Sequence, residues 1–453
     1  MGGLFSVNVT FTILAVALPR IADDFGTTRN TMTWVITGPL LAFGVAAPTL
    51  GKAADQYGAK KVYQLGLILS FFAAGLSALA WGAIPLIVIR TIGSLEGAAT
   101  GAASMAIVMR TFGREERVKA MGWWSLVGAG GPVIGVVLGG FLLESFGWRL
   151  IFAAQMPLIA AAFILGSIVL SDTETLPPQK FDIAGALTLS GGITALLFAI
   201  NRGPELGWDS GVVLVSFALC PLLLWWFVRV ERRSAAPLLS LDYLKKRSFA
   251  FPVASQALAN FAYMGGFILT PALLQTAYRY SDEKIGLIVI ARPLSFSILS
   301  PIAGYLAVKI GQRTSAVTGT AFVVASMFVF ASLGSGSPNL IIIIALVLSG
   351  VGLGVSSPSI AAGVANAVDD LDLGVASAAQ QLMNNVGIVS GIQLMTTIQT
   401  SVSHGATGAA SLPGFRAAYL VGGAVCIAGV LLAMGVKNEH ARPELHPELM
   451  EPF

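Results

Sequence analysis

The segment Gly51-Lys-Ala-Ala-Asp55-Gln-Tyr-Gly58-Ala-Lys60-Lys61 joins two long apolar stretches of this 453-residue chain. A membrane protein carries lysines on its cytoplasmic loops, which explains the basic end of the segment but not the acid or the glycines. Glycines allow a tight turn between closely packed helices, and a carboxylate can meet a helix N-terminus and basic side chains. The segment therefore predicts two membrane-crossing helices joined by a turn that latches onto a neighbouring part of the protein.

The composition of the whole chain indicates a membrane protein. Hydrophobic residues make up 55% of the sequence and charged residues only 11%, whereas a soluble domain carries roughly 25% charged residues. This excludes a soluble enzyme, a nucleic-acid-binding protein and a disordered chain. The formal net charge of +4 fits basic loops that face anionic lipid headgroups. Cys220 and Cys426 lie in apolar runs and the three histidines lack ligand spacing, so we expect neither a disulfide nor a metal site.

Apolar runs of about 20 residues, the length that crosses a bilayer, predict an all-α polytopic protein with fourteen transmembrane helices. Their approximate ranges are 3–22, 31–51, 62–80, 83–109, 119–143, 149–170, 182–200, 212–230, 250–277, 284–308, 315–333, 339–363, 374–398 and 416–436. With the N-terminus inside, about two thirds of the 27 Lys and Arg residues face the cytoplasm, which is typical of the positive-inside rule. We therefore expect a multi-pass protein of the plasma or inner membrane with both termini in the cytoplasm.

An internal repeat divides the chain. Two sets of residues recur at offsets of 253 and 252: Gly51, Gly58 and Lys60 with Gly304, Gly311 and Arg313, and Gly122, Gly135 and Gly139 with Gly374, Gly387 and Gly391. Transporters are often built from such repeats. The sequence thus predicts an N-terminal six-helix half over 1–170, two inserted helices and a basic linker over 171–248, a C-terminal six-helix half over 249–436, and a cytoplasmic tail over 437–453.

These motifs resemble those of the major facilitator superfamily, and in particular its fourteen-helix drug:proton antiporter branch. The segment 51–61 resembles the superfamily's signature loop, and Arg90 matches the arginine of its second motif. The residues that resemble the third, antiporter motif are Gly131, Pro132, Gly135 and Gly139. The resemblance implies a gating latch and a functional kink at Pro132, although small residues there also favour close helix packing. The residues assigned to the latch are Gly51, Asp55, Gly58, Lys60 and Lys61.

Several charges depart from the pattern of that family. Thr10 stands where many relatives carry an acid, Val308 replaces the acid of the second latch, and Arg292 lies in the middle of a span. A charge in the bilayer costs about 2.5–3.5 kcal/mol on insertion scales. Glu96, the sole acid well inside a span, is therefore our candidate for proton coupling together with Arg90. Alternatively, Glu96 forms a structural ion pair with an arginine, and Arg292 neutralises it or caps carbonyls freed by Pro293.

A further set of polar residues lies within the predicted spans. They either line a substrate cavity or hold helices together, and they are Asn8, Thr10, Asn260, Tyr263, Arg292, Gln380, Gln381, Asn384 and Asn385. Because the embedded charges sum to +1, we expect neutral or anionic amphiphiles to be preferred over dications.

The sequence as a whole predicts a monomeric secondary active transporter that exports amphipathic small molecules or drugs by alternating access. The proton gradient is the expected driving force, with no cofactor and no nucleic-acid partner. A lipid exporter or flippase of the same fold is the alternative. An intramembrane enzyme is disfavoured because no nucleophile with a base and no His/Asp cluster is visible, and a channel is disfavoured because filter segments are lacking.

Overall fold

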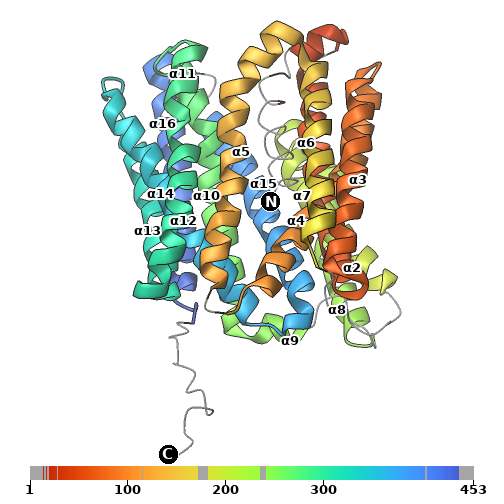
Figure 1. The fold of residues 1–453 in the computed structure, drawn as a ribbon. Coiled ribbons are helices and arrows are strands. Elements are labelled where there is room, and N and C mark those ends of the chain that lie inside the picture. Colours follow the sequence, from red (N-terminus) through yellow and green to blue (C-terminus); the bar gives the residue numbers. More distant parts are fainter. Residues whose placement is uncertain are drawn as a thin grey trace, which may run out of the picture.

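In the computed structural model the helices stand side by side in one bundle (Figure 1). The structure describes residues 14, 17, 20–27, 29–114, 116–171, 182–234, 241–403 and 406–437. Within these ranges the chain is helical and has no β-strand, so the predicted all-α fold class is confirmed. Ten helices in this part of the chain are long and apolar enough to cross a membrane. The count of fourteen transmembrane helices remains a prediction.

The long helices follow the apolar runs of the sequence. They are α2 (Arg29–Tyr57), α3 (Ala59–Ala78), α4 (Ala83–Thr111), α5 (Arg117–Phe146), α6 (Trp148–Val169), α7 (Ile183–Leu206), α8 (Gly211–Glu231), α10 (Arg247–Thr276), α12 (Ala291–Ile310), α13 (Gln312–Ala331), α14 (Asn339–Asn366), α15 (Leu373–Ser403) and α16 (Leu412–Ala433). Short helices lie between them: α9 (Leu241–Lys245), α11 (Asp282–Val289), η1 (Asp370–Asp372) and η2 (Gly408–Ser411).

The predicted span 284–308 is divided into α11 and α12, with Ile290 between them. Pro293 follows the break and has no N–H group to donate to the carbonyl of Val289, which is sufficient to interrupt the helix there. The two pieces still form one segment long enough to cross a membrane, residues Glu283–Ile310.

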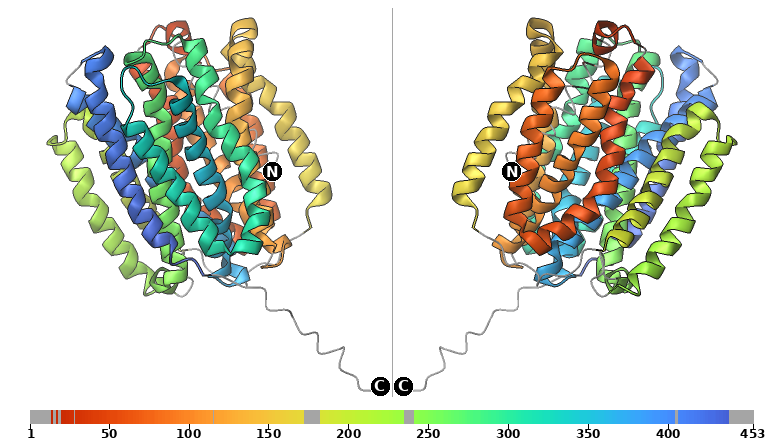
Figure 2. Two further views of the ribbon diagram at one scale, coloured as in Figure 1. Left: turned by 90° about the vertical axis from the view of Figure 1, so that its left-hand side faces the viewer. Right: turned by 90° about the vertical axis from the view of Figure 1, so that its right-hand side faces the viewer.

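Helix packing repeats along the chain. In the earlier part α2 packs on α4, and in the later part their repeat counterparts α12 and α14 pack on each other. Two further contacts join helices that are far apart in the sequence, α2 with α15 and α5 with α12. Helices α7 and α8 pack together, and α8 lies at the edge of the bundle in both views of Figure 2. The domain boundaries drawn from the sequence remain predictions.

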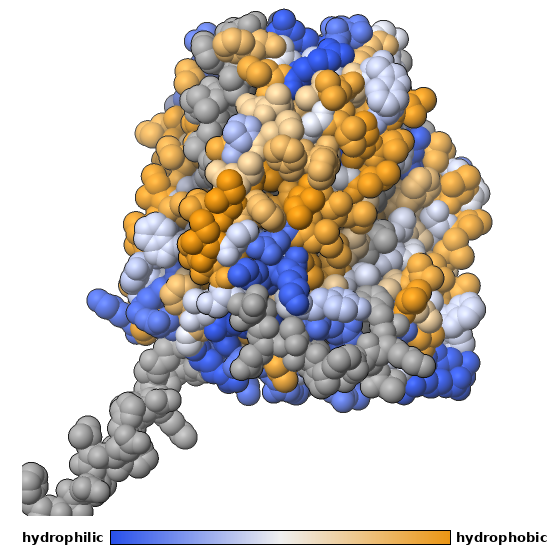
Figure 3. All heavy atoms as spheres, turned by 45° about the vertical axis from the view of Figure 1, so that its right-hand side comes forward, coloured by the Kyte–Doolittle hydropathy of each residue, from blue (hydrophilic) through white to orange (hydrophobic). Residues whose placement is uncertain are grey.

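The outside of the bundle is apolar. Large hydrophobic side chains such as Phe72, Ile164 and Leu222 are more than half exposed. Hydrophobic residues cover most of the middle of the face in Figure 3, while hydrophilic residues gather towards its two ends. An exposed apolar belt of this kind is stable in hydrocarbon and not in water, so the protein is a multi-pass membrane protein.

Candidate functional site

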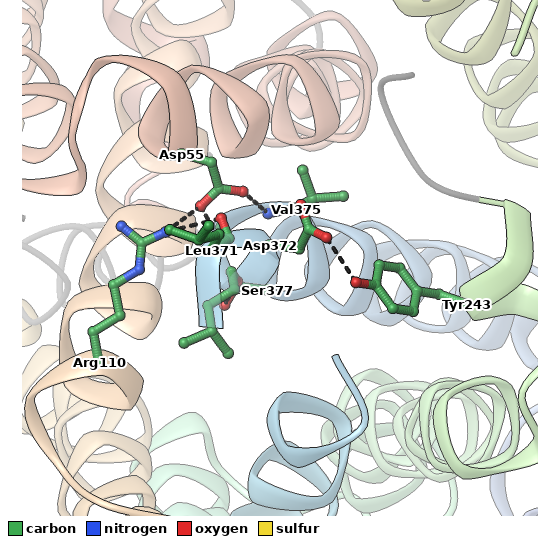
Figure 4. Close-up of polar contacts among 9 residues, drawn as sticks. Asp55, Arg110, Tyr243, Leu371, Asp372, Val375 and Ser377 are labelled. Carbon is green, nitrogen blue, oxygen red and sulfur yellow. Dashed lines mark hydrogen bonds and ion pairs between the residues drawn. The ribbon is translucent and has the colours of Figure 1, made fainter. Parts of the chain in front are cut away.

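Asp55 lies in the last turn of α2, and its side chain is fully buried. Its Oδ1 accepts hydrogen bonds from Arg110 Nη2 at 2.6 Å and from the Gly374 N–H at 2.8 Å, while Oδ2 accepts from the Val375 N–H at 2.8 Å (Figure 4). Gly374 and Val375 lie in the first turn of α15, and the first N–H groups of a helix have no partner within it. The carboxylate of α2 therefore binds the positive end of α15, as an anion does at a helix N-terminus.

The other residues of the segment 51–61 shape this contact. Gly51 is buried against α15, where a methyl group would lie 2.6 Å from the carbonyl oxygen of Gly374, so a larger residue would force the helices apart. Gly58 has φ +98°, a left-handed conformation that glycine adopts without strain. Lys60 is half-buried and Lys61 is exposed.

A second close approach joins α5 to α12. A methyl group on Gly122 would lie 2.7 Å from the carbonyl oxygen of Ser300, and one on Gly304 would lie 2.8 Å from that of Val118. Gly51 and Gly304 are repeat counterparts, as are Gly122 and Gly374. Glycines of both repeats therefore allow backbone contact at both crossings, α2 with α15 and α5 with α12.

The turn between α14 and α15, residues 369–372, is acidic, and we call it the acidic turn. Arg117 at the start of α5 donates from Nη2 to Asp370 Oδ1 at 2.7 Å and from Nη1 to Asn366 Oδ1 at 3.0 Å. The Arg117 hydrogen bond holds the pKa of the Asp370 carboxyl below its usual value. Arg117 and Asp370 are 253 positions apart, close to the offset of 252 that relates Gly122 of α5 to Gly374 of α15. This ion pair therefore joins nearly equivalent positions of the two repeats, the start of α5 and the turn before α15.

Two more contacts reach the acidic turn. Arg110 donates to the carbonyl of Leu371 at 3.2 Å, and Tyr243 of α9 donates to Asp372 Oδ2 at 2.7 Å (Figure 4). We call this end of the bundle, where Asp55, Arg110 and Arg117 meet residues 366–375, the latch end. The acidic turn was not among the predicted site residues, although three aspartates directly before a predicted span were a visible signal.

The embedded charges Arg90 and Glu96 face different neighbours. The Glu96 carboxyl group is buried on α4 and faces Ser70 of α3. Its Oε2 has no hydrogen-bond partner within the described part of the chain. The Arg90 guanidinium lies 5.6 Å from the centre of the Phe152 ring. The geometry thus places Glu96 between α3 and α4 with capacity for a further proton or hydrogen bond.

Arg292 is 1% exposed, and its guanidinium lies between two aromatic rings, 5.4 Å from the centre of Tyr263 and 5.5 Å from that of Phe330. Its Nη1 donates to the Tyr263 carbonyl at 3.2 Å. That carbonyl belongs to α10 and is not one that Pro293 frees. Arg292 therefore ties α12 to α10 and α13 inside the C-terminal part of the bundle.

The polar residues predicted to line a cavity fall into two groups. Asn260 is buried on α10, while α15 carries Gln381, Asn384 and Asn385. Gln381 lies against Gly101 of α4, and its Nε2 and Asn384 Oδ1 have no hydrogen-bond partner among the described residues. Such amides at a helix interface can serve substrate binding or helix association.

Some predicted site residues cannot be assigned contacts. Thr10 and Asn8 lie outside the described residues, and so do the side chains of Pro132, Gly135 and Gly139 within α5; Gly131 is buried. In the part of the chain that the structure describes, no cluster of His, Cys, Asp or Glu could hold a metal ion.

The repeated helices of this membrane protein meet at two glycine crossings and are bound together at one end. This architecture is typical of solute transporters. The chain belongs to the Major Facilitator Superfamily, whose family model matches residues 1–241 and 253–451. It is a transporter and not an enzyme. The family resemblance inferred from the motifs is thereby confirmed.

Its relatives include drug-resistance transporters. The chain is 28% identical over 403 residues to the multidrug resistance protein Stp of Mycobacterium tuberculosis, covering 87% of this chain and 74% of that protein. It is 27% identical to the multidrug transporter protein MdtP of Bacillus subtilis, covering 86% and 72%. It is 26% identical to the tetracenomycin C resistance and export protein of Streptomyces glaucescens, covering 88% and 74%.

Solved structures share the fold. The human organic anion transporter MFSD10 superposes with a TM-score of 0.68 at 14% identity, covering 95% of this chain and 97% of that one. The proton:xylose symporter XylE superposes with a TM-score of 0.63 at 15% identity, covering 95% and 92%. At these identities the match concerns the fold alone.

Proposed function

We propose that this protein exports drugs and other amphipathic small molecules from the cell, working by alternating access and driven by the proton gradient. The names of its relatives, which include multidrug resistance and antibiotic export, support drug efflux. They give no support to lipid export. The observation that carries the mechanism is the bond between the Asp55 carboxylate and the N-terminus of α15, because it joins the two halves at one end of the bundle.

The latch end is the cytoplasmic end in this proposal, because the lysines and arginines of the predicted loops concentrate there. The closed latch then corresponds to a state that faces outwards, from which substrate leaves. Separation of α2 from α15 and of α5 from α12 would open the cytoplasmic side, where substrate enters from the cytoplasm or the inner leaflet. The plasma or inner membrane is the location that fits such an exporter.

Glu96 is the proton carrier in this proposal. It is a buried acid, one oxygen of which has no hydrogen-bond partner among the described residues, and its exchange of a proton would couple to the packing of α3 on α4. A carboxyl group that loses and regains its charge changes its hydration cost by several kcal/mol, at about the scale needed to bias two conformations.

The substrate class follows from the same charges. Amide groups of α15 offer hydrogen bonds without a negative charge, and the embedded residues Arg90, Glu96 and Arg292 leave an excess of one positive charge. In a site of low dielectric constant this charge repels dications more strongly than it does in water. Neutral, zwitterionic and anionic amphiphiles are therefore the preferred substrates.

Transport by purified protein in liposomes tests the proposal. A pH gradient is imposed, and the movement of several fluorescent amphiphiles is recorded with and without a protonophore. The wild type should move at least one of them against its gradient only while the pH gradient lasts. Glu96→Gln should lose this gradient-driven transport and retain downhill exchange, since the residue still fits but cannot ionise. Unchanged proton coupling in Glu96→Gln would transfer the role to another group.

A further inference from the structure

The short helix α9 lies at the latch end, just before α10, and carries one buried aromatic residue. The Tyr243 side chain is 6% exposed. The centre of its ring lies 6.0 Å from the centre of the Phe249 ring. Lys246 Nζ lies 4.7 Å from the centre of the Tyr243 ring. A tyrosine buried in this way needs a partner for its hydroxyl group.

The hydroxyl group meets both ends of the acidic turn. It lies 2.7 Å from Asp372 Oδ2 and 3.1 Å from Asp369 Oδ2, and the Asp369 N–H reaches it at 3.4 Å. One proton serves one carboxylate at a time, and the shorter contact identifies Asp372 as the main acceptor. Burial, followed by the hydrogen bond to Asp372, raises the pKa of Tyr243, so the group remains a donor at neutral pH.

The remaining groups of the turn point to the other half of the protein. Asp370 binds Arg117 of α5, and the Leu371 carbonyl binds Arg110 of α4. Tyr243 and Arg110 approach the turn from opposite sides in Figure 4. The turn therefore has one side fixed to α9 and another side that meets α4 and α5.

We propose that Tyr243 is a positioning residue for transport, which holds the acidic turn in the shape that α2, α4 and α5 bind when the latch end closes. The inference rests on the proposed function in one respect, that the latch end opens and closes during transport. Tyr243 belongs to the segment leading into α10 and packs on it, so it moves with the C-terminal half and keeps its bond in both states.

The physical advantage is preorganisation. Fixing the backbone of a loop residue costs conformational entropy. A turn held by Tyr243 has lost this freedom before the halves meet, so closure does not bear the cost. Asp369 and Asp372 also carry like charges, and the shared hydroxyl group offsets their mutual repulsion. Without it the turn would spread, and the groups facing Arg110 and Arg117 would lose their positions.

The test compares two tyrosines at opposite ends of the bundle, each of which has a hydroxyl group that donates to a side-chain oxygen and a lysine near its ring. Tyr243→Phe removes one hydroxyl group and keeps the ring. The matched control is Tyr280→Phe, because the Tyr280 hydroxyl donates to Asn339 Oδ1 at 2.6 Å and Lys284 Nζ lies 3.4 Å from the ring centre. Both variants remove a hydroxyl group that bonds to a side-chain oxygen beneath a lysine.

The readout is the distance between spin labels on cysteines introduced at Ser171, directly after α6, and at Lys309, at the end of α12, which are both exposed at the latch end. The native Cys220 and Cys426 are replaced by alanine, and pulsed electron paramagnetic resonance gives the distance distribution in liposomes. We expect Tyr243→Phe to raise the ratio of long to short distances about 10-fold, because closure then has to order about one more residue of the turn. Tyr280→Phe should match the starting protein.

A second variant separates positioning from general stability. Asp372→Asn should produce a similar shift, and the double variant Tyr243→Phe/Asp372→Asn should be no more open than either single one, because both changes remove the same bond. The melting temperature should differ little among the folded variants. An unchanged distance distribution in Tyr243→Phe, an equal shift in Tyr280→Phe, or additive shifts in the double variant would each overturn the proposal. The measurement needs neither substrate nor proton gradient, so a failed drug-efflux assay would leave its result intact.

Discussion

Replacing Asp55 by asparagine removes the charge of the latch and keeps its shape. Arg110 belongs to the same half as Asp55, so their 2.6 Å ion pair persists when the halves separate. The bonds that break on opening are those from the Gly374 and Val375 N–H groups, at 2.8 Å each. An asparagine side chain has one oxygen, which can accept from only one of these two N–H groups in the same geometry. Its NH2 group then faces the second N–H group and cannot accept from it.

The size of the effect follows from these bonds. A hydrogen bond to a charged group contributes about 1.5–3 kcal/mol and a neutral one about 0.5–1.5 kcal/mol. Losing two charged hydrogen bonds and gaining one neutral hydrogen bond weakens closure by about 2.5–4.5 kcal/mol. At 1.4 kcal/mol per factor of ten, the ratio of open to closed protein rises roughly 60- to 1,600-fold. A transporter that rarely closes its latch end cycles slowly, but its substrate site is unchanged.

The assay measures net transport in liposomes and equilibrium binding of the same substrate to detergent-purified protein. Asp55→Asn should lose most of its transport and keep its binding constant within a few-fold. Asp24→Asn is the matched control, since the Asp24–Arg149 pair is of similar length, 2.9 Å, but is about half exposed on both sides. A surface pair contributes about 0–1 kcal/mol, so this variant should transport normally. A large loss of substrate affinity in folded Asp55→Asn, or equal inactivation of both variants, would refute the reasoning.

Other perturbations have outcomes of their own. Gly374→Ala should hold the latch end open and raise its labelling by thiol reagents, because the new methyl group would meet the α2 backbone, whereas Gly336→Ala points into open space and should have no effect. The hydrogen bond from Arg117 lowers the pKa of Asp370 from 3.8. The ion pair therefore stabilises the closed latch end fully at pH values above 3.8, and this stabilisation is lost only as the pH falls through the lowered pKa. Asp370→Asn should therefore slow transport equally across about pH 6–8 without reshaping the pH profile. Arg292→Leu should reduce, several-fold, the preference for an anionic over a matched dicationic amphiphile in competition assays, and strong dication transport unaffected by the change would exclude the charge model.

Much of the fold could be predicted because bilayer thickness sets the length of apolar runs. Helix α15 shows the limit of this argument. It is 31 residues long but is not among the ten helices selected by apolarity, because its glutamines, asparagines and threonines lower its hydropathy. Those amides lie between helices, where hydropathy alone does not predict their burial. The break at Ile290 was foreseeable from Pro293, although one uninterrupted span was predicted over 284–308.

The candidate site also has a part that could be predicted from the sequence and a part that could not. Glycine spacing and one acid predicted a latch at Asp55, since few other roles require that combination. The partners of the latch could not be predicted, because Gly374 and Asp55 are 319 positions apart in the sequence. The role of Tyr243 depends on a carboxylate 129 positions away, and no local pattern encodes such a distance. Arg292 was identified as unusual from its position in a span, but its aromatic neighbours come from other helices.

Transport by protein locked across the latch end tests the central claim most directly. Cysteines replace Arg117 and Asp370, whose side chains meet at the latch end at 2.7 Å, in a background without native cysteines, and a reducible bifunctional thiol reagent bridges them. The Asp55 latch remains in this variant, so the unbridged protein should still transport. Bridging should abolish net transport, and a reductant should restore it to the unbridged level. Transport by the bridged protein at the rate of the reduced protein would show that the two halves need not separate there, and would contradict the account.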